Sequence, residues 1–385
     1  MFLVTCGMAM PLAAYGVFLP VLSEAFGWSR GAISTALSIN LLMGGLAGFV
    51  IGALADRYGP RVMLVFTVVL AGAAFALVSM VGALWQLYLF VGLLGGVGTS
   101  SFYLLSAITI ARWFRERRGL ALSFVLVGFN LGYVTAGPLA AWLIAEFGWR
   151  AAYAALGGGA GLIALLGAMS VRVPRRAETV SADRRDHASA PDGLSLGQAL
   201  LDPRQWCLNA SWLLQGGLVF MVTVHIVPFA RDQGLSLAGA SLALTTYGAG
   251  AFVGRLVGGV ASDRLGTLTT IRAGFIAMTL AMVVLSWAPS RVAMLVSMAA
   301  FGAGFAATDT MVAKVIPDVF GLRAIGAIMG VLNFGWRVGA ALGPAAAGFL
   351  FDRAGSYTIA FGVAPLVVLL SWAFFSLGTS RVRMT

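Results

Sequence analysis

Long apolar runs separated by short polar intervals dominate the chain and set its predicted architecture. Twelve of these runs are long enough to cross the hydrocarbon core of a bilayer, which is about 30 Å thick, as helices rising about 1.5 Å per residue. The long fourth, fifth and eleventh runs leave room for helix tilt or for extension beyond the bilayer. The expected spans are 2–22, 32–55, 62–82, 85–111, 119–145, 150–171, 206–230, 238–261, 268–287, 292–313, 322–350 and 356–378.

Composition places the chain in the membrane class. Hydrophobic residues make up 60% of the 385 residues and charged residues only 10%, whereas a soluble domain carries roughly 25% charged residues. The net charge of +11 comes from basic residues scattered through short loops, so the expected partner is the lipid bilayer and not nucleic acid. We therefore predict an all-α integral membrane protein.

The distribution of basic residues predicts the orientation of the helices. Of the 25 Lys and Arg residues, 18 fall in intervals on one side of the expected spans and five on the other. Loops rich in Lys and Arg stay in the cytoplasm. Both termini are therefore expected to be cytoplasmic.

The interval 172–205 differs from the rest, because it is rich in Arg, Asp, Ser, Ala and Pro and has no sustained apolar period. It is expected to be a cytoplasmic linker, with a short surface helix around Leu194–Leu201, between a half at 1–171 and a half at 206–385.

The two halves repeat each other at an offset of 207 residues, which carries Gly52 to Gly259. Such tandem repeats build transporters whose substrate site lies between the halves near the bilayer midplane. The same offset carries Gly128 to Gly335, Gly132 to Gly339, and Gly148 to Gly355.

The stretch 247–266 combines a charge with a packing pattern. Arg255 has about eight uncharged residues on either side, and a charge near the bilayer centre costs about 2.5–3.5 kcal/mol on insertion scales. Gly250, Gly254 and Gly258 recur every four residues, which lets a neighbouring helix approach closely. We predict a functional charge beside a helix–helix seam.

Signature motifs give the chain a family resemblance. The pattern Gly52-x-x-x-Asp56-Arg57-x-Gly59-x-Arg61, with a second copy from Gly259 to Gly266, resembles the signature of the major facilitator superfamily. The resemblance covers essentially the whole chain and implies twelve helices in two six-helix halves related by pseudo-symmetry. Five further segments are similar to the bacterial monocarboxylate and oxalate:formate antiporter branch: Phe26–Arg30, Ala111–Gly119, His225–Gly234, Gly254–Leu256 and Gly343–Tyr357.

Two arginines inside expected spans are the principal candidate ligands. Arg255 offers paired donors that match a carboxylate, and the resemblance implies that the arginine at this position binds substrate. The alternative is an internal ion pair with Asp232 or Asp309. Arg337 matches a second cation of oxalate-type relatives, or it faces helix 7 (206–230) or helix 10 (292–313) structurally. One arginine suits a monocarboxylate, and two suit a small dicarboxylate.

Neutral polar and aromatic residues complete the predicted cavity. The 207-residue offset places Asn130 opposite Arg337 in the pseudo-symmetry. Tyr103 resembles a substrate-facing tyrosine of monocarboxylate relatives, and Ser101 lies near it. Tyr15 and Tyr247 are candidate aromatic walls, with ordinary helix packing as the alternative for each aromatic residue.

Proton coupling requires a group that titrates, and the candidates are Asp309, Asp232 and His225. Asp309 lies inside an expected span, Asp232 matches an aspartate implicated in relatives, and histidine titrates near neutral pH. The alternatives are an ion pair of Asp309 with Lys314 or Arg323, a solvated Asp232 beside Arg231, and a structural His225.

The repeated signature predicts conformational gating. Its aspartate caps a helix or pairs with a nearby arginine, which would hold the inner helix ends together while the outer side is open. The alternative is a simple topology signal. The gating residues are expected to be Asp56, Arg57, Arg61, Asp263 and Arg264.

The function predicted from these features is secondary active transport of small organic anions, monocarboxylates first, by alternating access with proton symport. Exchange of small dicarboxylates such as oxalate and efflux of hydrophobic compounds are the alternatives. The sequence shows no nucleophile–base pair and no metal-ligand spacing, so no enzyme and no cofactor are expected; Cys6 and Cys207 are expected to be packing residues. The resemblance implies a functional monomer in a bacterial-type inner membrane.

Overall fold

A computed structural model gives the structure of the chain, and it describes all residues except 101–104, 107–108, 110–117, 172–192, 288–289 and 381–385. Within the described residues every regular element is helical, apart from one isolated bridge between Gly193 and Gly321. The all-α prediction is therefore confirmed.

The helices before residue 170 are α1 (Phe2–Phe26), α2 (Arg30–Tyr58), α3 (Pro60–Leu77), the short η1 (Val78–Met80), α4 (Leu84–Leu87), η2 (Tyr88–Leu94), α5 (Gly95–Thr99) and α7 (Arg118–Met169). The later helices are α9 (Leu196–Leu201), α10 (Pro203–Asp232), α11 (Leu237–Leu265), α12 (Thr267–Trp287), α13 (Arg291–Phe320), α14 (Ile325–Ala354) and α15 (Thr358–Thr379).

The expected membrane spans correspond to these helices. Ten described helices are long and apolar enough to cross a bilayer. One of them, α7, changes direction at Gly148, where φ is 76° and ψ is 163°, so it supplies both the fifth and the sixth expected span. The fourth expected span begins in α4, η2 and α5 and continues into residues 101–111, most of which lie outside the described part of the chain.

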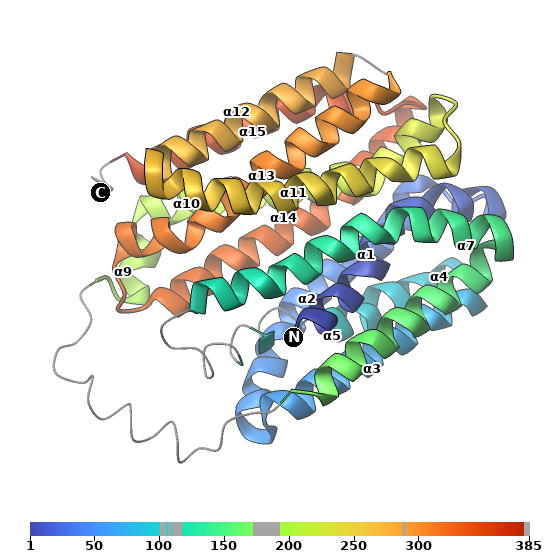
Figure 1. Cartoon of the computed structure of the whole chain (residues 1–385), viewed down its shortest axis with the longest axis horizontal. Coiled ribbons are helices and arrows are strands. Elements are labelled where there is room, and N and C mark those ends of the chain that lie inside the picture. The colour runs from blue at the N-terminus through green and yellow to red at the C-terminus, as the bar shows by residue number, and fades with distance from the viewer. Residues whose placement is uncertain (101–104, 107–108, 110–117, 172–192, 288–289, 381–385) are drawn as a thin grey trace. The chain divides into compact units, whose positions relative to one another are not determined.

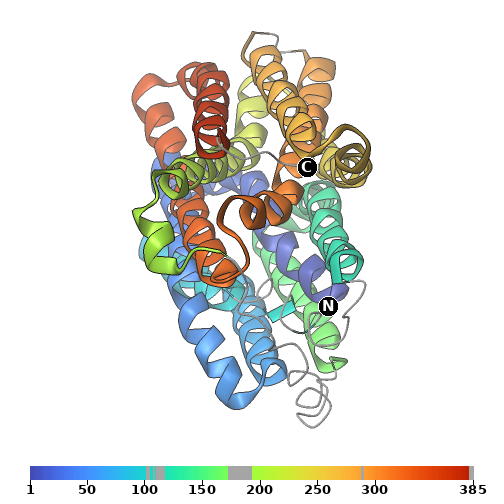
Figure 2. The same cartoon turned by 90° about the vertical axis from the view of Figure 1, so that its left-hand side faces the viewer.

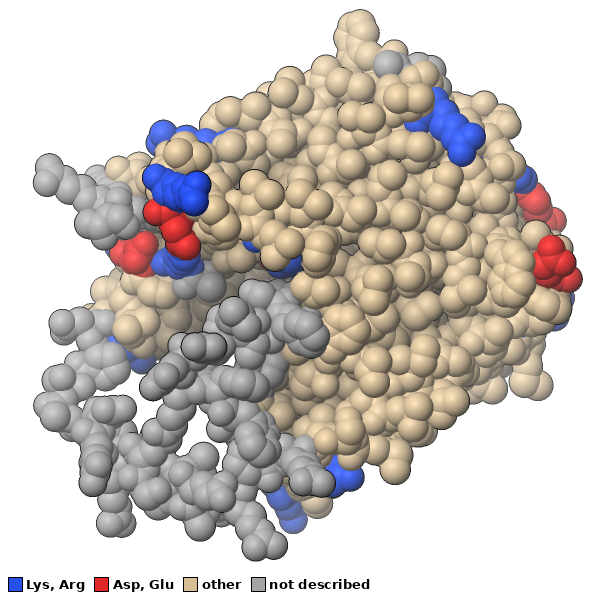
Figure 3. Space-filling view, viewed as in Figure 1, with Lys and Arg blue, Asp and Glu red and all other residues tan. Residues whose placement is uncertain are grey.

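The helix surfaces suit a lipid environment. Phe49 of α2 is 63% exposed and Leu280 of α12 is 59% exposed. On the face shown in Figure 3, charged side chains gather toward the helix ends, and most of the surface between them carries no charge. Apolar side chains that would be unfavourable in water are favourable against lipid tails.

The chain forms two compact units. The first unit comprises Met1–Ala188 together with Thr223–Thr245, and the second comprises Ser189–Val222 together with Thr246–Thr385. The end of α10 and the start of α11 therefore pack with the first unit, although both helices belong to the second half of the sequence. The division of the sequence at 172–205 stays a prediction.

Glycines bring α7 against α1 in the first unit, where the two helices run side by side (Figures 1 and 2). A Cβ atom at Gly128 would lie 2.5 Å from the Phe2 carbonyl oxygen, and one at Gly132 would lie 2.8 Å from the Cys6 carbonyl oxygen. Only glycine permits backbones to approach so closely.

The second unit repeats this contact between α14 and α10. Gly335 faces the side chain of Asn209, and Gly339 faces the carbonyl oxygen of Leu213. In the first unit residue 132 contacts residue 6. In the second unit the residues 207 positions later, 339 and 213, make the same contact. The repeat seen in the sequence is therefore a repeat of packing as well.

A layer of α12, α13 and α15 completes the second unit; α12 contacts both other helices (Figure 1). The rings of Phe275 and Trp372 lie 6.0 Å apart at 5° between planes, which joins α12 to α15. Gly274 of α12 faces the Gly304 carbonyl of α13, where a Cβ atom would lie 2.8 Å from the oxygen.

The described end of the predicted linker is ordered. Ser195 and Gln198 form a capping box at the start of α9, and the Leu194 N–H donates to the Phe320 carbonyl at 2.8 Å. The short helix expected around Leu194–Leu201 is confirmed, and α10 begins at Pro203 within the expected linker.

Candidate functional site

Arg255 of α11 forms an ion pair with Asp309 of α13, with 2.9 Å between Nη2 and Oδ2. The arginine side chain is 13% exposed and the aspartate side chain 32% exposed. Nε and Nη1 of Arg255 are buried and have no hydrogen-bond partner among the described residues. The aspartate therefore uses one donor group of the guanidinium and leaves two unused.

The glycines of α11 explain how this pair forms. Gly250 faces the carbonyl oxygen of Ala299, and Gly254 faces that of Ala303. A Cβ atom at Gly258 would lie 3.1 Å from the Cβ of Ala307. These successive contacts confirm the predicted seam and identify α13 as its partner, which brings Asp309 within reach of Arg255.

The pair has a simple chemical capacity. A guanidinium binds a carboxylate most strongly through two parallel N–H donors. Because Asp309 is held through Nη2 alone, a second carboxylate that replaces it would gain Nη2 together with Nε or Nη1.

The partner of Asp309 distinguishes among the alternatives set by the sequence. Lys314 donates instead to Asp263 at 2.8 Å and to the Ser262 hydroxyl at 2.9 Å. The pairing of Asp309 with Lys314 is therefore wrong for this structure, and the internal pair with Arg255 is the arrangement observed.

Arg337 is partly buried in α14. Gly335 and Gly339, two residues to either side, face α10. Because residues two apart project to nearly opposite sides of a helix, Arg337 lies on the side away from that seam. Its position does not support the alternative that it faces helix 7, which is α10; its role at the substrate site stays a prediction.

The other predicted cavity residues are dispersed over both units. Asn130 in α7 is 4% exposed, and its Nδ2 has no partner among the described residues. The Tyr15 hydroxyl donates to the Ile33 carbonyl at 2.6 Å, and the Tyr247 ring centroid lies 6.0 Å from that of Phe301. Tyr103 and Ser101 lie outside the described residues.

Asp232 and His225 lie at the end of α10 that packs with the first unit. Asp232 accepts two hydrogen bonds from Arg30, at 2.6 and 2.7 Å. Its side chain is 36% exposed, so it is a partly solvated charge whose ion-pair partner is Arg30. His225 is fully buried, and its Nε2 lies 3.3 Å from the Ser34 hydroxyl oxygen.

The repeated signature lies at helix ends and not in a free loop. Arg57 is in the last turn of α2, Arg264 is in the last turn of α11, and both are exposed. Arg61 donates to the Met169 carbonyl at 2.7 Å, and Asp263 accepts from Lys314. The Asp56 side chain lies outside the described part of the structure. Gly59 and Gly266 follow these helices with φ of 90° and 88°, which explains why glycine is needed there.

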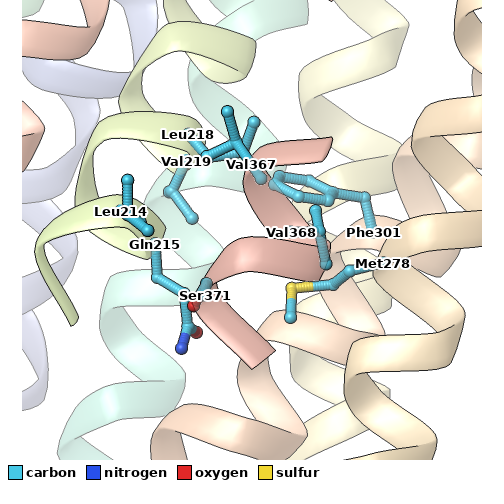
Figure 4. A pocket seen from close by; sticks show the side chains of 9 residues that line it. All are labelled: Leu214, Gln215, Leu218, Val219, Met278, Phe301, Val367, Val368 and Ser371. Carbon is cyan, nitrogen blue, oxygen red and sulfur yellow. The ribbon is translucent and has the colours of Figure 1, made fainter. Parts of the chain in front are cut away.

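Sequence analysis did not single out Gln215. Its Oε1 accepts from the Thr308 hydroxyl at 3.2 Å, and its buried Nε2 has no partner in the described structure. Its side chain lines a narrow pocket in the second unit, at the same end as Ser371 (Figure 4). A polar residue inside an apolar run was the available signal. The rest of the pocket wall is apolar: Leu214, Leu218, Val219, Met278, Phe301, Val367 and Val368.

None of the described residues that line this pocket is a cation, so the pocket does not suit an organic anion. The Arg255–Asp309 pair is the better candidate site, because it combines a largely buried cation, a carboxylate that contacts one guanidinium nitrogen, and two donors without a partner among the described residues.

Repeated glycine-seamed helix packing, long apolar helices and a charge pair inside a span define a multi-pass membrane protein. The family model of the Major Facilitator Superfamily matches residues 1–239 and 219–383. The chain belongs to this superfamily, and it is a transporter and not an enzyme.

Two relatives and one solved structure illustrate what the chain is similar to. Monocarboxylate transporter 11 of Mus musculus is 28% identical over 96% of this chain and 83% of its own length. The oxalate:formate antiporter of Oxalobacter formigenes is 26% identical over 71% of this chain and 64% of its own length. The structure of a bacterial homologue of the human lysosomal transporter Spinster, inward-facing and occupied, has a TM-score of 0.75 at 17% identity, covering 98% and 95% of the two chains.

Proposed function

We propose that the protein carries small monocarboxylates across the membrane together with protons. The observation that carries this proposal is the buried Arg255, which holds one carboxylate through a single nitrogen while its Nε and Nη1 have no partner in the described structure. A monocarboxylate needs one such cation. A hydrophobic solute has no carboxylate to pair with this cation, so efflux of hydrophobic compounds is disfavoured.

Asp309 is the proposed proton acceptor. While it is ionised it neutralises Arg255, and a buried unpaired arginine would be unfavourable. When Asp309 takes up a proton, Arg255 is released to bind the substrate carboxylate. Substrate and proton then enter together, and the site stays close to neutral in both states.

The names of the relatives support the substrate class. The chain is similar to a monocarboxylate transporter over nearly its whole length. Arg337, with the similarity to an oxalate:formate antiporter, favours a second candidate function, the exchange of small dicarboxylates. In that case Arg337 would bind the second carboxylate.

The proposed setting is a bacterial-type inner membrane, with a functional monomer and both termini in the cytoplasm. The excess of basic residues on the side of the termini supports this orientation. The surrounding lipid is then the only other partner that transport requires.

The test is uptake of labelled lactate, formate, oxalate and malonate into proteoliposomes, with and without an inward proton gradient. We expect gradient-driven uptake of a monocarboxylate. Arg255→Ala should raise KM by at least about tenfold, because hydrogen bonds between charged groups are lost. Arg255→Lys should be intermediate, since it keeps the charge without the planar pair of donors.

Dicarboxylate exchange that is indifferent to the gradient would instead establish the second candidate function and assign Arg337 as a ligand. Absence of carboxylate flux in a folded protein under every condition would overturn both candidates.

A further inference from the structure

The ion pair of Arg30 with Asp232 has no role in the proposed carboxylate site. Nη1 of Arg30 donates to Oδ2 at 2.6 Å, and Nη2 donates to Oδ1 at 2.7 Å. The arginine side chain is 15% exposed and the aspartate side chain 36% exposed. This two-point geometry is the strong form of an arginine–carboxylate contact, and it joins residues 202 positions apart.

The pair lies on a docking surface inside the first unit. Residues 223–245 are the facing ends of α10 and α11; they belong to the second half of the sequence but pack with Met1–Ala188. A Cβ atom at Gly16 of α1 would lie 2.6 Å from the Val224 carbonyl oxygen. Ser34 lies 3.3 Å from His225, and Thr245 donates to the Val134 carbonyl at 2.9 Å.

Arg30 is held in place by the local structure between α1 and α2. Gly27 ends α1 with φ of 68°, and the Ser23 hydroxyl donates to the Trp28 carbonyl at 2.8 Å. Ser29 caps α2 by accepting from the Ala32 N–H at 3.2 Å. Arg30 is therefore the first residue of a fixed helix.

Asp232 is held in a similar way. It is the last residue of α10, and the Gly234 N–H donates to the Arg231 carbonyl at 2.9 Å, with φ of 85° at Gly234. The backbone at both positions is already fixed by local structure, so docking has to order only the two side chains.

Helix dipoles add a reason for the pair to form. A cation at the start of α2 and an anion at the end of α10 are each at the unfavourable end of their own helix. Docking places the carboxylate of Asp232 near the start of α2 and the guanidinium of Arg30 near the end of α10. Each charge then lies at the favourable end of the other helix, so the dipoles favour the docked state.

We propose that Arg30 and Asp232 form a latch that closes the transporter at the helix ends opposite the N-terminus, the side that we assign to the cell exterior. The latch must open for a solute to pass on that side, because residues 223–245 of the second repeat are held against the first repeat through it. The neighbouring pair of Arg231 with Glu24 is longer, at 3.3 Å, and Glu24 is 67% exposed, so it contributes little.

The test follows the accessibility of a cysteine behind the latch and needs no knowledge of the solute. Ser34 is fully buried, one turn into α2 from Arg30. Ser34→Cys is made in the full chain with Cys6→Ala and Cys207→Ala, and its labelling by N-ethylmaleimide is timed in proteoliposomes. Arg30→Gln or Asp232→Asn should raise the labelling rate by about tenfold, as expected for the loss of a charge-assisted contact.

Glu24→Gln is the matched control, because it removes a neighbouring exposed ion pair; it should change the rate by less than about twofold. The double variant Arg30→Asp with Asp232→Arg should recover slow labelling in part, since it keeps the pair but reverses its alignment with the helix dipoles.

Unchanged labelling in both folded single variants would overturn the latch. If the single variants do not fold, the double variant decides the matter. Slow labelling of this variant supports the latch. If the folded double variant is labelled tenfold faster than the parent, the result contradicts the latch. Failure of this test leaves the carboxylate proposal intact, since labelling is measured without substrate.

Discussion

At the scale of single residues, three charge pairs of similar composition have different surroundings. Arg255 and Asp309 lie within helices, with 13% and 32% of their side chains exposed, and Arg255 has two unused donors. Arg30 and Asp232 use two matched hydrogen bonds at helix ends. Lys314 and Asp263 are 46% and 74% exposed. Only the first pair combines burial with spare hydrogen-bonding capacity, which suits exchange of one carboxylate for another.

Removing the acid from that pair separates coupling from binding. Asp309→Asn leaves Arg255 with its full charge and without a competing carboxylate. We expect exchange of labelled for unlabelled monocarboxylate to continue, while accumulation driven by a proton gradient is lost. Both fluxes are measured in the same proteoliposomes.

Glu24→Gln serves as the control for this variant, because it breaks the exposed pair with Arg231 and leaves the Arg255 site intact. Gradient-driven accumulation that survives in Asp309→Asn would contradict the assigned coupling role.

At the scale of helices, close approach of α11 to α13 depends on the absence of side chains. Gly254 faces the backbone of Ala303, and a Cβ atom there would be too close to the carbonyl oxygen. Gly259, five residues later on the same helix, has no heavy atom within 4 Å of its would-be Cβ. The same chemical change therefore has opposite consequences at the two positions.

Gly254→Ala is expected to destabilise the protein by about 1–3 kcal/mol, since α11 and α13 must separate or distort. Gly259→Ala is expected to be neutral, or stabilising by up to about 1 kcal/mol because alanine favours helix. Unfolding of the two variants by denaturant in one detergent measures the difference. Equal stability of the two variants would show that the seam does not depend on glycine.

At the scale of the whole molecule, charge distribution and helix length together predict how the protein crosses the membrane. Gln233 and Thr269 are exposed, and they lie just beyond opposite ends of α11. Because α11 is long and apolar enough to span a bilayer, these two positions should face opposite compartments.

With Cys6 and Cys207 removed, Gln233→Cys should react with a membrane-impermeant maleimide in intact cells. Thr269→Cys should react only after permeabilisation, because basic loops remain in the cytoplasm. The opposite pattern would reverse the orientation and place the latch on the cytoplasmic side.

Much of the fold could be predicted from the sequence because membrane helices obey local rules. Apolar length sets the spans, glycine spacing marks the helix faces that pack closely, and the offset of 207 shows the repeat. The prediction was less successful at helix ends. Asp263 and Arg264 lie in the last turn of α11, since a polar signature can extend a helix beyond the membrane before a glycine ends it.

The candidate site was only partly predictable. Arg255 stands out because a charge within an apolar run is unfavourable and needs a reason. Its partner could not be chosen from sequence, because Asp232 and Asp309 were both available and helix spacing does not say which helix is adjacent. Gln215 and Arg30 could be recognised as candidate functional residues only from the residues that surround them in the structure.

The sequence by itself determined the membrane class, the helical architecture, the repeat and the two arginines, Arg255 and Arg337, that lie inside apolar runs. These properties depend on the chemistry of each segment and on periodicity along one helix. Only the tertiary structure decided which aspartate pairs with which arginine, that α13 covers the glycine face of α11, and that residues 223–245 pack with the first unit. The physical reason is that contacts between helices depend on how separate helices pack, and the pattern along any one helix leaves several neighbours equally possible.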